Sequence, residues 1–129
     1  MPDAEVILST LEAVAERHGD PTALVYKHLF EAHPDLERLF HMDRDGGVRA
    51  SMVQQGFECI IDYVGPRLTA PQIISASRLH HEGYGVPDGM FGKFFVATRD
   101  ALRDILGPAW TPAMETEWGR LLAAFDAIR

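Results

Sequence analysis

The chain has very little cysteine and a shortage of positive charge. Cys59 is the only cysteine in 129 residues, and 12 Lys and Arg stand against 19 Asp and Glu. A single cysteine excludes an internal disulfide and is typical of a reducing cytoplasm. The formal net charge of −7 disfavours nucleic acid or an anionic membrane surface as the main partner. The expected partner is therefore a small molecule or another protein.

Long apolar runs and a secretory leader are also missing. The longest apolar run covers only a few residues, which is too short to cross a membrane. The start, MPDAEVIL, lacks the basic segment and apolar core of a signal peptide. A composition of 47% hydrophobic and 24% charged residues is that of a globular protein. We expect a single domain over residues 1–129, located in the cytoplasm.

Familiar catalytic signatures are not found. The sequence contains no His-Glu-x-x-His, no pair of cysteines, no phosphate-binding loop and no nucleophile elbow. Nothing therefore supports a hydrolytic or phosphoryl-transfer enzyme, and whether the protein is an enzyme stays open.

What the sequence does have is helical periodicity. Apolar stripes at helical spacing cover residues 6–15, 24–30, 36–40, 48–64, 73–79, 91–106 and 118–125. Asp20-Pro21 and Thr111-Pro112 are each interpreted as an N-cap followed by proline at the first helical position. Pro87-Asp88 is expected to open one helix that continues to Leu106. Because no segment alternates apolar and polar residues, the predicted fold class is all-α.

Four segments together resemble one family. They are VYKHLFEAHPDLERLF (25–40), GFECIIDYV (56–64), HEGYGVPDGMF (81–91) and WTPAMETEWGRLLAAFD (110–126). In order and spacing they are similar to the single-domain bacterial globins and to the globin domain of flavohaemoglobins. The resemblance implies a three-over-three helical sandwich around a haem pocket. The cofactor would be haem b held non-covalently, because no Cys-x-x-Cys-His is present to attach it.

The resemblance assigns the haem iron to His81. Only from His81 do Val86 and Phe91 fall at the globin spacings, and His80 points about 100 degrees away on the helix. A neutral imidazole is the usual proximal ligand in globins, and it is oriented by donating its other ring N–H to a carbonyl or hydroxyl. Ser77, one turn earlier, could supply that acceptor.

On the distal side the resemblance singles out four residues. Tyr26 matches the tyrosine whose hydroxyl donates to bound oxygen in many bacterial globins, and Phe40 matches the phenylalanine that wedges against the haem. Met52 takes the place of the usual histidine or glutamine, and Gly56 leaves room for a flat ligand. A shift of three residues would put Gln55 at that place instead of Met52.

The implied function is reversible binding of oxygen, or of nitric oxide or carbon monoxide, at a ferrous iron. Phe91 stands where flavohaemoglobins have a tyrosine, and their partner glutamate has no clear match here. No reductase domain follows Arg129, so any redox turnover is expected to need a separate reductase. A haem-free or gas-sensing globin-fold module and a nitric-oxide dioxygenase remain alternatives, and a homodimer is left open. A zinc site is disfavoured, because the spacings put its four candidate ligands on different faces; these are His28, His33, His80 and His81.

Overall fold

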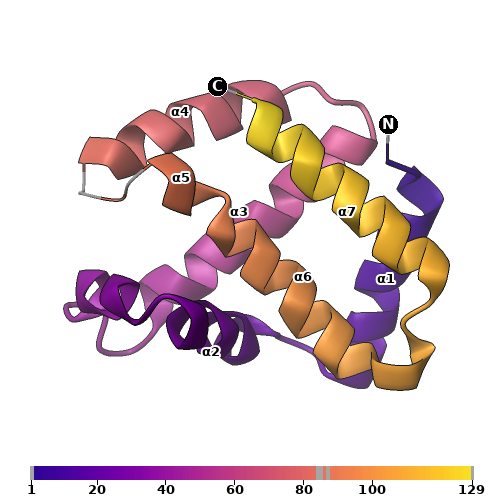
Figure 1. Cartoon of the computed structure of the whole chain (residues 1–129), viewed down its shortest axis with the longest axis horizontal. Coiled ribbons are helices and arrows are strands. Elements are labelled where there is room, and N and C mark those ends of the chain that lie inside the picture. Colours follow the sequence, from indigo (N-terminus) through magenta and orange to yellow (C-terminus); the bar gives the residue numbers. More distant parts are fainter. Residues whose placement is uncertain (1, 84–85, 87, 129) are drawn as a thin grey trace.

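The computed structural model describes residues 2–83, 86 and 88–128, and it is built from helices (Figure 1). The helices are α1 (Ala4–Arg17), α2 (Thr22–Ala32), the 3₁₀ helix η1 (Pro34–Phe40), α3 (Gly47–Val64), α4 (Ala70–Gly83), α5 (Asp88–Phe91), α6 (Lys93–Leu106), the 3₁₀ helix η2 (Gly107–Ala109) and α7 (Pro112–Ala127). The described residues contain no strand, which confirms the all-α prediction. None of the described helices combines the length and hydropathy that a membrane crossing requires.

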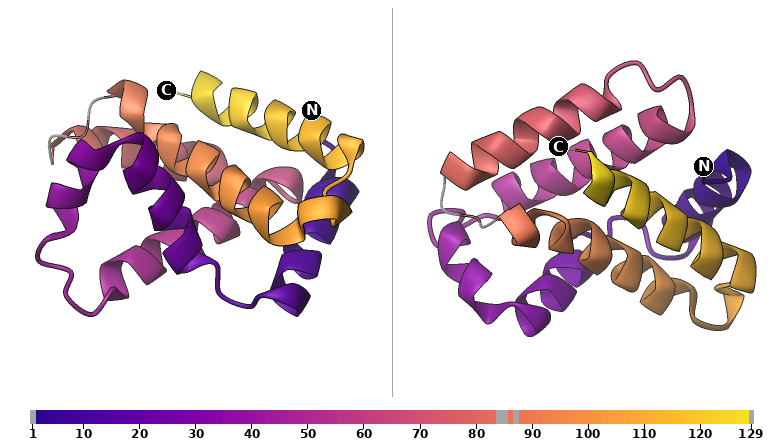
Figure 2. Two further views of the ribbon diagram at one scale, coloured as in Figure 1. Left: turned by 60° about the horizontal axis from the view of Figure 1, so that its bottom comes forward. Right: turned by 45° about the horizontal axis from the view of Figure 1, so that its top comes forward.

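The long helices pack as two layers of three. One layer consists of α2, α6 and α7, in which α6 contacts both other helices, and the other consists of α1, α3 and α4, in which α3 contacts both other helices. Contacts of α1 with α6 and α7, and of α2 with α3, join the layers. Figures 1 and 2 show α6 crossing α3 near the middle of the molecule, with α4 and α7 at the same end. This is the three-over-three arrangement that the sequence predicts.

Helix starts follow the predicted capping chemistry in one case and differ in another. The Thr111 hydroxyl accepts the N–H of Met114 at 3.1 Å, with Pro112 as the first residue of α7, as expected. At α2 the helix begins at Thr22, so Pro21 takes the cap position that was expected for Asp20. Asp20 nevertheless accepts the Thr22 N–H at 3.0 Å. The carboxylate therefore still satisfies a free donor of the first turn.

The predicted helix from Pro87-Asp88 to Leu106 is wrong in one respect, because it is divided at Gly92. Helix α5 ends at Phe91 and α6 begins at Lys93. A Cβ atom on Gly92 would lie 3.1 Å from a carboxylate oxygen of Asp126, so the end of α7 approaches the backbone closely there. Pro87, which is expected to open this helix, lies outside the described residues.

Two clusters of buried side chains form the core. The larger joins α1, α3, α4, α6 and α7 around Trp118, and the smaller joins α2, α3 and α6 around Val25 and Tyr26. Each large apolar side chain that is fully buried contributes about 1.5–3 kcal/mol to folding. The clusters join the two layers along α3 and α6, and some of their members, among them Cys59, Ile74 and Phe95, also line a cavity.

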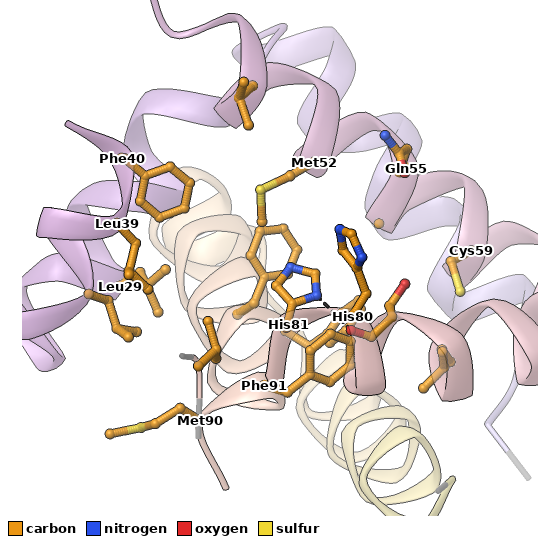
Figure 3. A pocket seen from close by; sticks show the side chains of 18 of the residues that line it. Leu29, Leu39, Phe40, Met52, Gln55, Cys59, His80, His81, Met90 and Phe91 are labelled. Atoms are coloured by element: carbon orange, nitrogen blue, oxygen red, sulfur yellow. Dashed lines mark hydrogen bonds between the residues drawn. The ribbon is translucent and has the colours of Figure 1, made fainter. Parts of the chain in front are cut away.

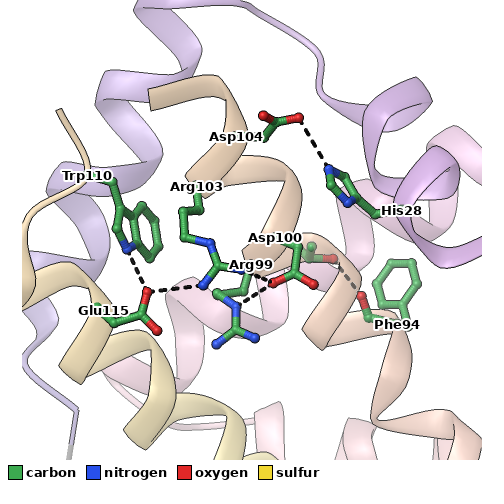
Figure 4. A network of polar contacts seen from close by, with 9 residues as sticks. His28, Phe94, Arg99, Asp100, Arg103, Asp104, Trp110 and Glu115 are labelled. Atoms are coloured by element: carbon green, nitrogen blue, oxygen red, sulfur yellow. Dashed lines mark hydrogen bonds and ion pairs between the residues drawn. The ribbon is translucent and has the colours of Figure 1, made fainter. Parts of the chain in front are cut away.

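Polar contacts fix α6 to its neighbours (Figure 4). Glu115 accepts the Trp110 indole N–H at 2.9 Å and an Arg103 N–H at 3.2 Å, and both bonds hold its pKa below the ordinary value. Arg103 also reaches Asp100 at 3.0 Å. These contacts join α6 to η2 and α7 and restrict how α6 can rotate.

Asp62 fixes the start of α4, the helix that carries His80 and His81. Its carboxylate accepts the N–H groups of Leu68, Thr69 and Ala70 at 3.2, 3.0 and 2.7 Å. The bond from Ala70 is the largest of the causes that lower the pKa of Asp62. Backbone donors at a helix start favour an ionised acceptor. Asp62 thus connects the end of α3 to the beginning of α4.

We expect Asp62→Ala to lower the melting temperature at neutral pH. A carboxyl with a depressed folded-state pKa stabilises the protein above its ordinary pKa, and this stabilisation is lost as the pH falls through the folded-state value. The difference in melting temperature between wild type and variant should therefore shrink in acid. Thermal melts of both proteins across pH 7 to 3 measure it, and a difference independent of pH would contradict the role of the ionised carboxylate.

Candidate functional site

A cavity of about 600 Å³ opens at the end of the molecule where α3 and α4 lie opposite η1 and α6 (Figure 3). This volume falls inside the range of about 300–1,000 Å³ that is typical of cofactor and ligand sites. Its walls are mostly apolar and come from six helices and from the segments after η1 and α4. The lining residues are Leu29, Leu36, Leu39, Phe40, Met42, Asp43, Val48, Met52, Gln55, Gly56, Cys59, Ile73, Ile74, Ser77, His80, His81, Val86, Met90, Phe91, Phe94 and Phe95.

His81 presents an imidazole to this cavity in a defined orientation. Its Nδ1 lies 2.7 Å from the backbone oxygen of Ser77. A carbonyl oxygen only accepts, so Nδ1 carries the proton and Nε2 keeps a free lone pair. This is the tautomer that a metal ligand requires, with the second hydrogen bond in place. Ser77 supplies the acceptor as predicted, but through its main chain, so the hydroxyl plays no part in this bond.

His80 lies at the edge of the same cavity. The two adjacent imidazoles are nearly perpendicular, with 5.9 Å between their ring centroids. His80 is exposed, and Figure 3 shows its ring on the side of Gln55, whereas His81 extends into the space opposite Met52. The divergence expected for neighbouring helical residues is therefore present, although both rings contact the cavity.

Phe91 and Arg78 form the proximal wall behind His81. The Phe91 and His81 ring centroids are 5.3 Å apart, and the Arg78 guanidinium lies 4.9 Å from the Phe91 ring centroid. Arg78 is buried, and it donates to the main-chain oxygens of Phe125 and Asp126 at 3.1 and 3.4 Å. A cation at a helix C-terminus is favourable, so Arg78 ties α4 to the end of α7. The corner after α4 is held by the Val86 N–H, which donates to the His81 oxygen at 3.0 Å.

Helix α3 forms the opposite wall with the stripe that the sequence predicts. Residues four apart advance by about 400 degrees, so such a stripe rotates slowly around its helix. Val48, Met52 and Gly56 line the cavity, and Ile60 and Val64 pass into the core. Gln55 also lines the cavity, but it is exposed and donates to the Ser51 hydroxyl at 3.0 Å. Met52 therefore points inward, and Gln55 lies at the rim.

Tyr26 lies one layer behind this wall. It is 4% exposed and packs against the rings of Phe30, Phe40 and Phe94. It is absent from the described cavity lining, and its hydroxyl donates to the Met52 sulfur at 3.7 Å. Burial raises the pKa of Tyr26 well above its ordinary value, so the hydroxyl keeps its proton at neutral pH.

Gly56 and Cys59 lie on the same face of α3. A Cβ on Gly56 would stand 3.1 Å from a Phe94 ring carbon, so glycine makes room for the Phe94 ring against α3. Cys59 is buried, and burial raises the pKa of its thiol to about 11. It is therefore a neutral thiol rather than a reactive thiolate.

The mouth of the cavity exposes apolar side chains that the described part of the chain leaves open to solvent. Leu39, Met42, Val48 and Ile73 all line the cavity and are 39–75% exposed. Beside them the buried Asp43 carboxylate accepts the N–H groups of Val48 and Arg49, each at 3.0 Å, and the Val48 bond is the leading cause that lowers its pKa. Asp43 thereby fixes the start of α3 next to the opening.

These features fit a haem. The cavity has the volume of a cofactor site, an imidazole with a free Nε2, a flat glycine wall opposite it, and apolar edges that a porphyrin would cover. Phe40, Val86 and Phe91 line it, together with Met52, Gly56 and His81. A zinc site receives no support, since the described residues include no group of three or more His, Cys, Asp or Glu side chains placed to hold a metal ion.

Comparison with known proteins agrees with this geometry. The globin family model matches residues 23–128. The chain therefore belongs to the globin family, whose members in general bind haem and diatomic gases such as oxygen. No individual curated protein matches it.

Sequence reasoning missed two contacts of this site. The buried Arg78 behind Phe91 carries no signal, because an arginine next to a helical stripe is usually exposed. The bond from Tyr26 to Met52 depends on how α2 and α3 cross, which residue spacing within each helix does not determine.

Proposed function

We propose that this globin binds haem b non-covalently, with His81 as the proximal ligand, and that it reversibly binds oxygen on the side of Met52 and Tyr26. The observation that carries the proposal is the bond from His81 Nδ1 to the Ser77 carbonyl, which leaves Nε2 as a ligand atom directed by a rigid helix. Haem would supply an iron atom whose sixth position accepts a diatomic gas.

Residues on different sides of the cavity would have different roles. Phe40 and the apolar mouth would exclude water from one edge, and Phe91 with Val86 would hold the proximal side. The Tyr26 hydroxyl, protonated at neutral pH, is a donor next to Met52 on the distal side. A bound oxygen molecule carries partial negative charge, so a donor in an apolar pocket favours its retention.

The proximal wall favours reversible binding over reductive turnover. Phe91 turns a phenyl ring toward His81, and a phenyl ring cannot accept or donate the hydrogen bond that would push electron density through the imidazole. Nitric-oxide dioxygenation with a separate reductase is therefore the second candidate.

We expect the ferrous protein to be five-coordinate in the absence of gas. The Met52 sulfur is held at the Tyr26 hydroxyl, and Gly56 one turn further along α3 leaves this side of the cavity open to a gas molecule. Purified protein titrated with haemin and reduced should show a Soret band of a high-spin ferrous species that shifts with carbon monoxide. Failure to take up haem would support the haem-free alternative. A six-coordinate ferrous spectrum that Met52→Leu converts to five-coordinate would show methionine ligation instead.

A further inference from the structure

The distal tyrosine has one hydroxyl proton, and in this structure it is already used. Tyr26 donates to the Met52 sulfur at 3.7 Å, across the interface of α2 and α3. Aromatic rings surround Tyr26 on several sides, with ring centroids at 5.3 to 6.1 Å, so its side chain has little freedom to turn. Met52 also lines the cavity, so the sulfur that accepts this proton belongs to a residue beside the space for a ligand.

A thioether is a weak acceptor, which makes the contact easy to exchange. Oxygen bound opposite His81 offers a more strongly charged acceptor, and the Tyr26 proton can satisfy only one of the two at a time. A hydrogen bond from Tyr26 to the ligand requires that the bond from Tyr26 to the Met52 sulfur be broken. The free energy gained from the new bond is therefore reduced by the free energy of the bond that is lost.

We propose that Met52 sets the oxygen affinity of this globin by competing with the bound ligand for the Tyr26 proton. The inference rests on the proposed function, since it concerns the ligand side of the same pocket. Met52 acts through Tyr26 and is a positioning residue. Removing its sulfur frees the hydroxyl for the ligand, so oxygen is held more strongly without Met52 than with it.

Met52→Leu keeps the volume of the side chain and removes the acceptor. In this variant oxygen should leave roughly five-fold more slowly, the equivalent of about 1 kcal/mol for one neutral hydrogen bond. In a Tyr26→Phe background the same substitution should change the release rate very little. Tyr26→Phe should accelerate oxygen release, and this acceleration should be smaller in the wild-type background than in the Met52→Leu background. The oxygen release rates of the wild type, the two single variants and the double variant, measured by stopped flow, form a double-mutant cycle.

Carbon monoxide gives a spectroscopic readout of the same proton. Its stretching frequency falls when a donor approaches its oxygen, so Met52→Leu should lower the frequency only when Tyr26 is present. Met114→Leu is the matched control, because the Met114 sulfur accepts the Thr111 N–H at 3.5 Å far along the chain in α7. It should leave both the release rate and the frequency unchanged.

The hydrogen bond itself can be tested without haem. In the apoprotein, Tyr26→Phe and Met52→Leu should each shift the midpoint of unfolding by denaturant. The shift in the double variant should differ from the sum of the two single shifts, because both substitutions remove the same hydrogen bond. A Soret band that responds to gas, combined with equal effects of Met52→Leu in both Tyr26 backgrounds, would overturn this inference and leave the proposed function intact. Faster release in Met52→Leu would also overturn it. Absence of any haem uptake would overturn both, even where the apoprotein midpoints are coupled.

Discussion

Replacing His81 with alanine is expected to weaken haem binding by at least about a hundred-fold, because loss of a residue that merely hydrogen-bonds to a metal ligand already costs about 10–100-fold. His81 supplies the only imidazole that the described structure aims into the middle of the cavity with Nδ1 bonded to a backbone carbonyl. Haemin titration followed at the Soret band measures the loss.

Two companion variants make the assignment specific. His80→Ala should retain most of the affinity, since His80 is exposed and lies at the rim. His81→Gly should recover a five-coordinate spectrum when free imidazole is added, because the small residue leaves room for the ring. Equal loss in the His80 and His81 variants, or loss only in His80→Ala, would overturn the assignment of the ligand.

Much of this site could be predicted because it depends on positions along single helices. The spacing from His81 to Val86 and Phe91 and the repeat of four from Val48 to Gly56 are properties of the sequence alone. Each of these residues lines the cavity. The capping chemistry at Thr111 is equally local, because the hydroxyl bonds a backbone N–H three residues away.

The features that could not be predicted arise where helices meet. Gly92 divides the expected helix where Asp126 of α7 approaches its backbone, and nothing in the sequence around Gly92 reports that approach. Tyr26 fits the globin spacing, but its hydroxyl faces a sulfur that only the crossing of α2 and α3 brings near. Helix registers can thus be obtained from periodicity, whereas donor and acceptor pairs between helices require the packed structure.

Gly56 offers the second large effect, since it lines the cavity without a side chain. Its missing side chain lets α3 lie against Phe94 and Phe95, both of which also line the cavity. Glycine within a helix is otherwise unfavourable by about 1 kcal/mol relative to alanine. Its presence in the middle of α3 therefore needs a reason, and close packing beside the haem space provides one.

Gly56→Leu is expected to abolish haem uptake at stoichiometric haemin, or to weaken it at least about ten-fold, since overpacking a wall typically costs about 1–3 kcal/mol. The first added carbon would lie 3.1 Å from the Phe94 ring, and the rest of the side chain has to enter the cavity or displace α6. Gly119→Leu is the matched control, because a Cβ there meets nothing within 4 Å. It should keep full haem uptake. Circular dichroism separates the possible causes, since a folded Gly56→Leu protein without haem confirms the filled cavity. A folded variant that binds haem as tightly as wild type would show that the flat face of α3 does not border the cofactor.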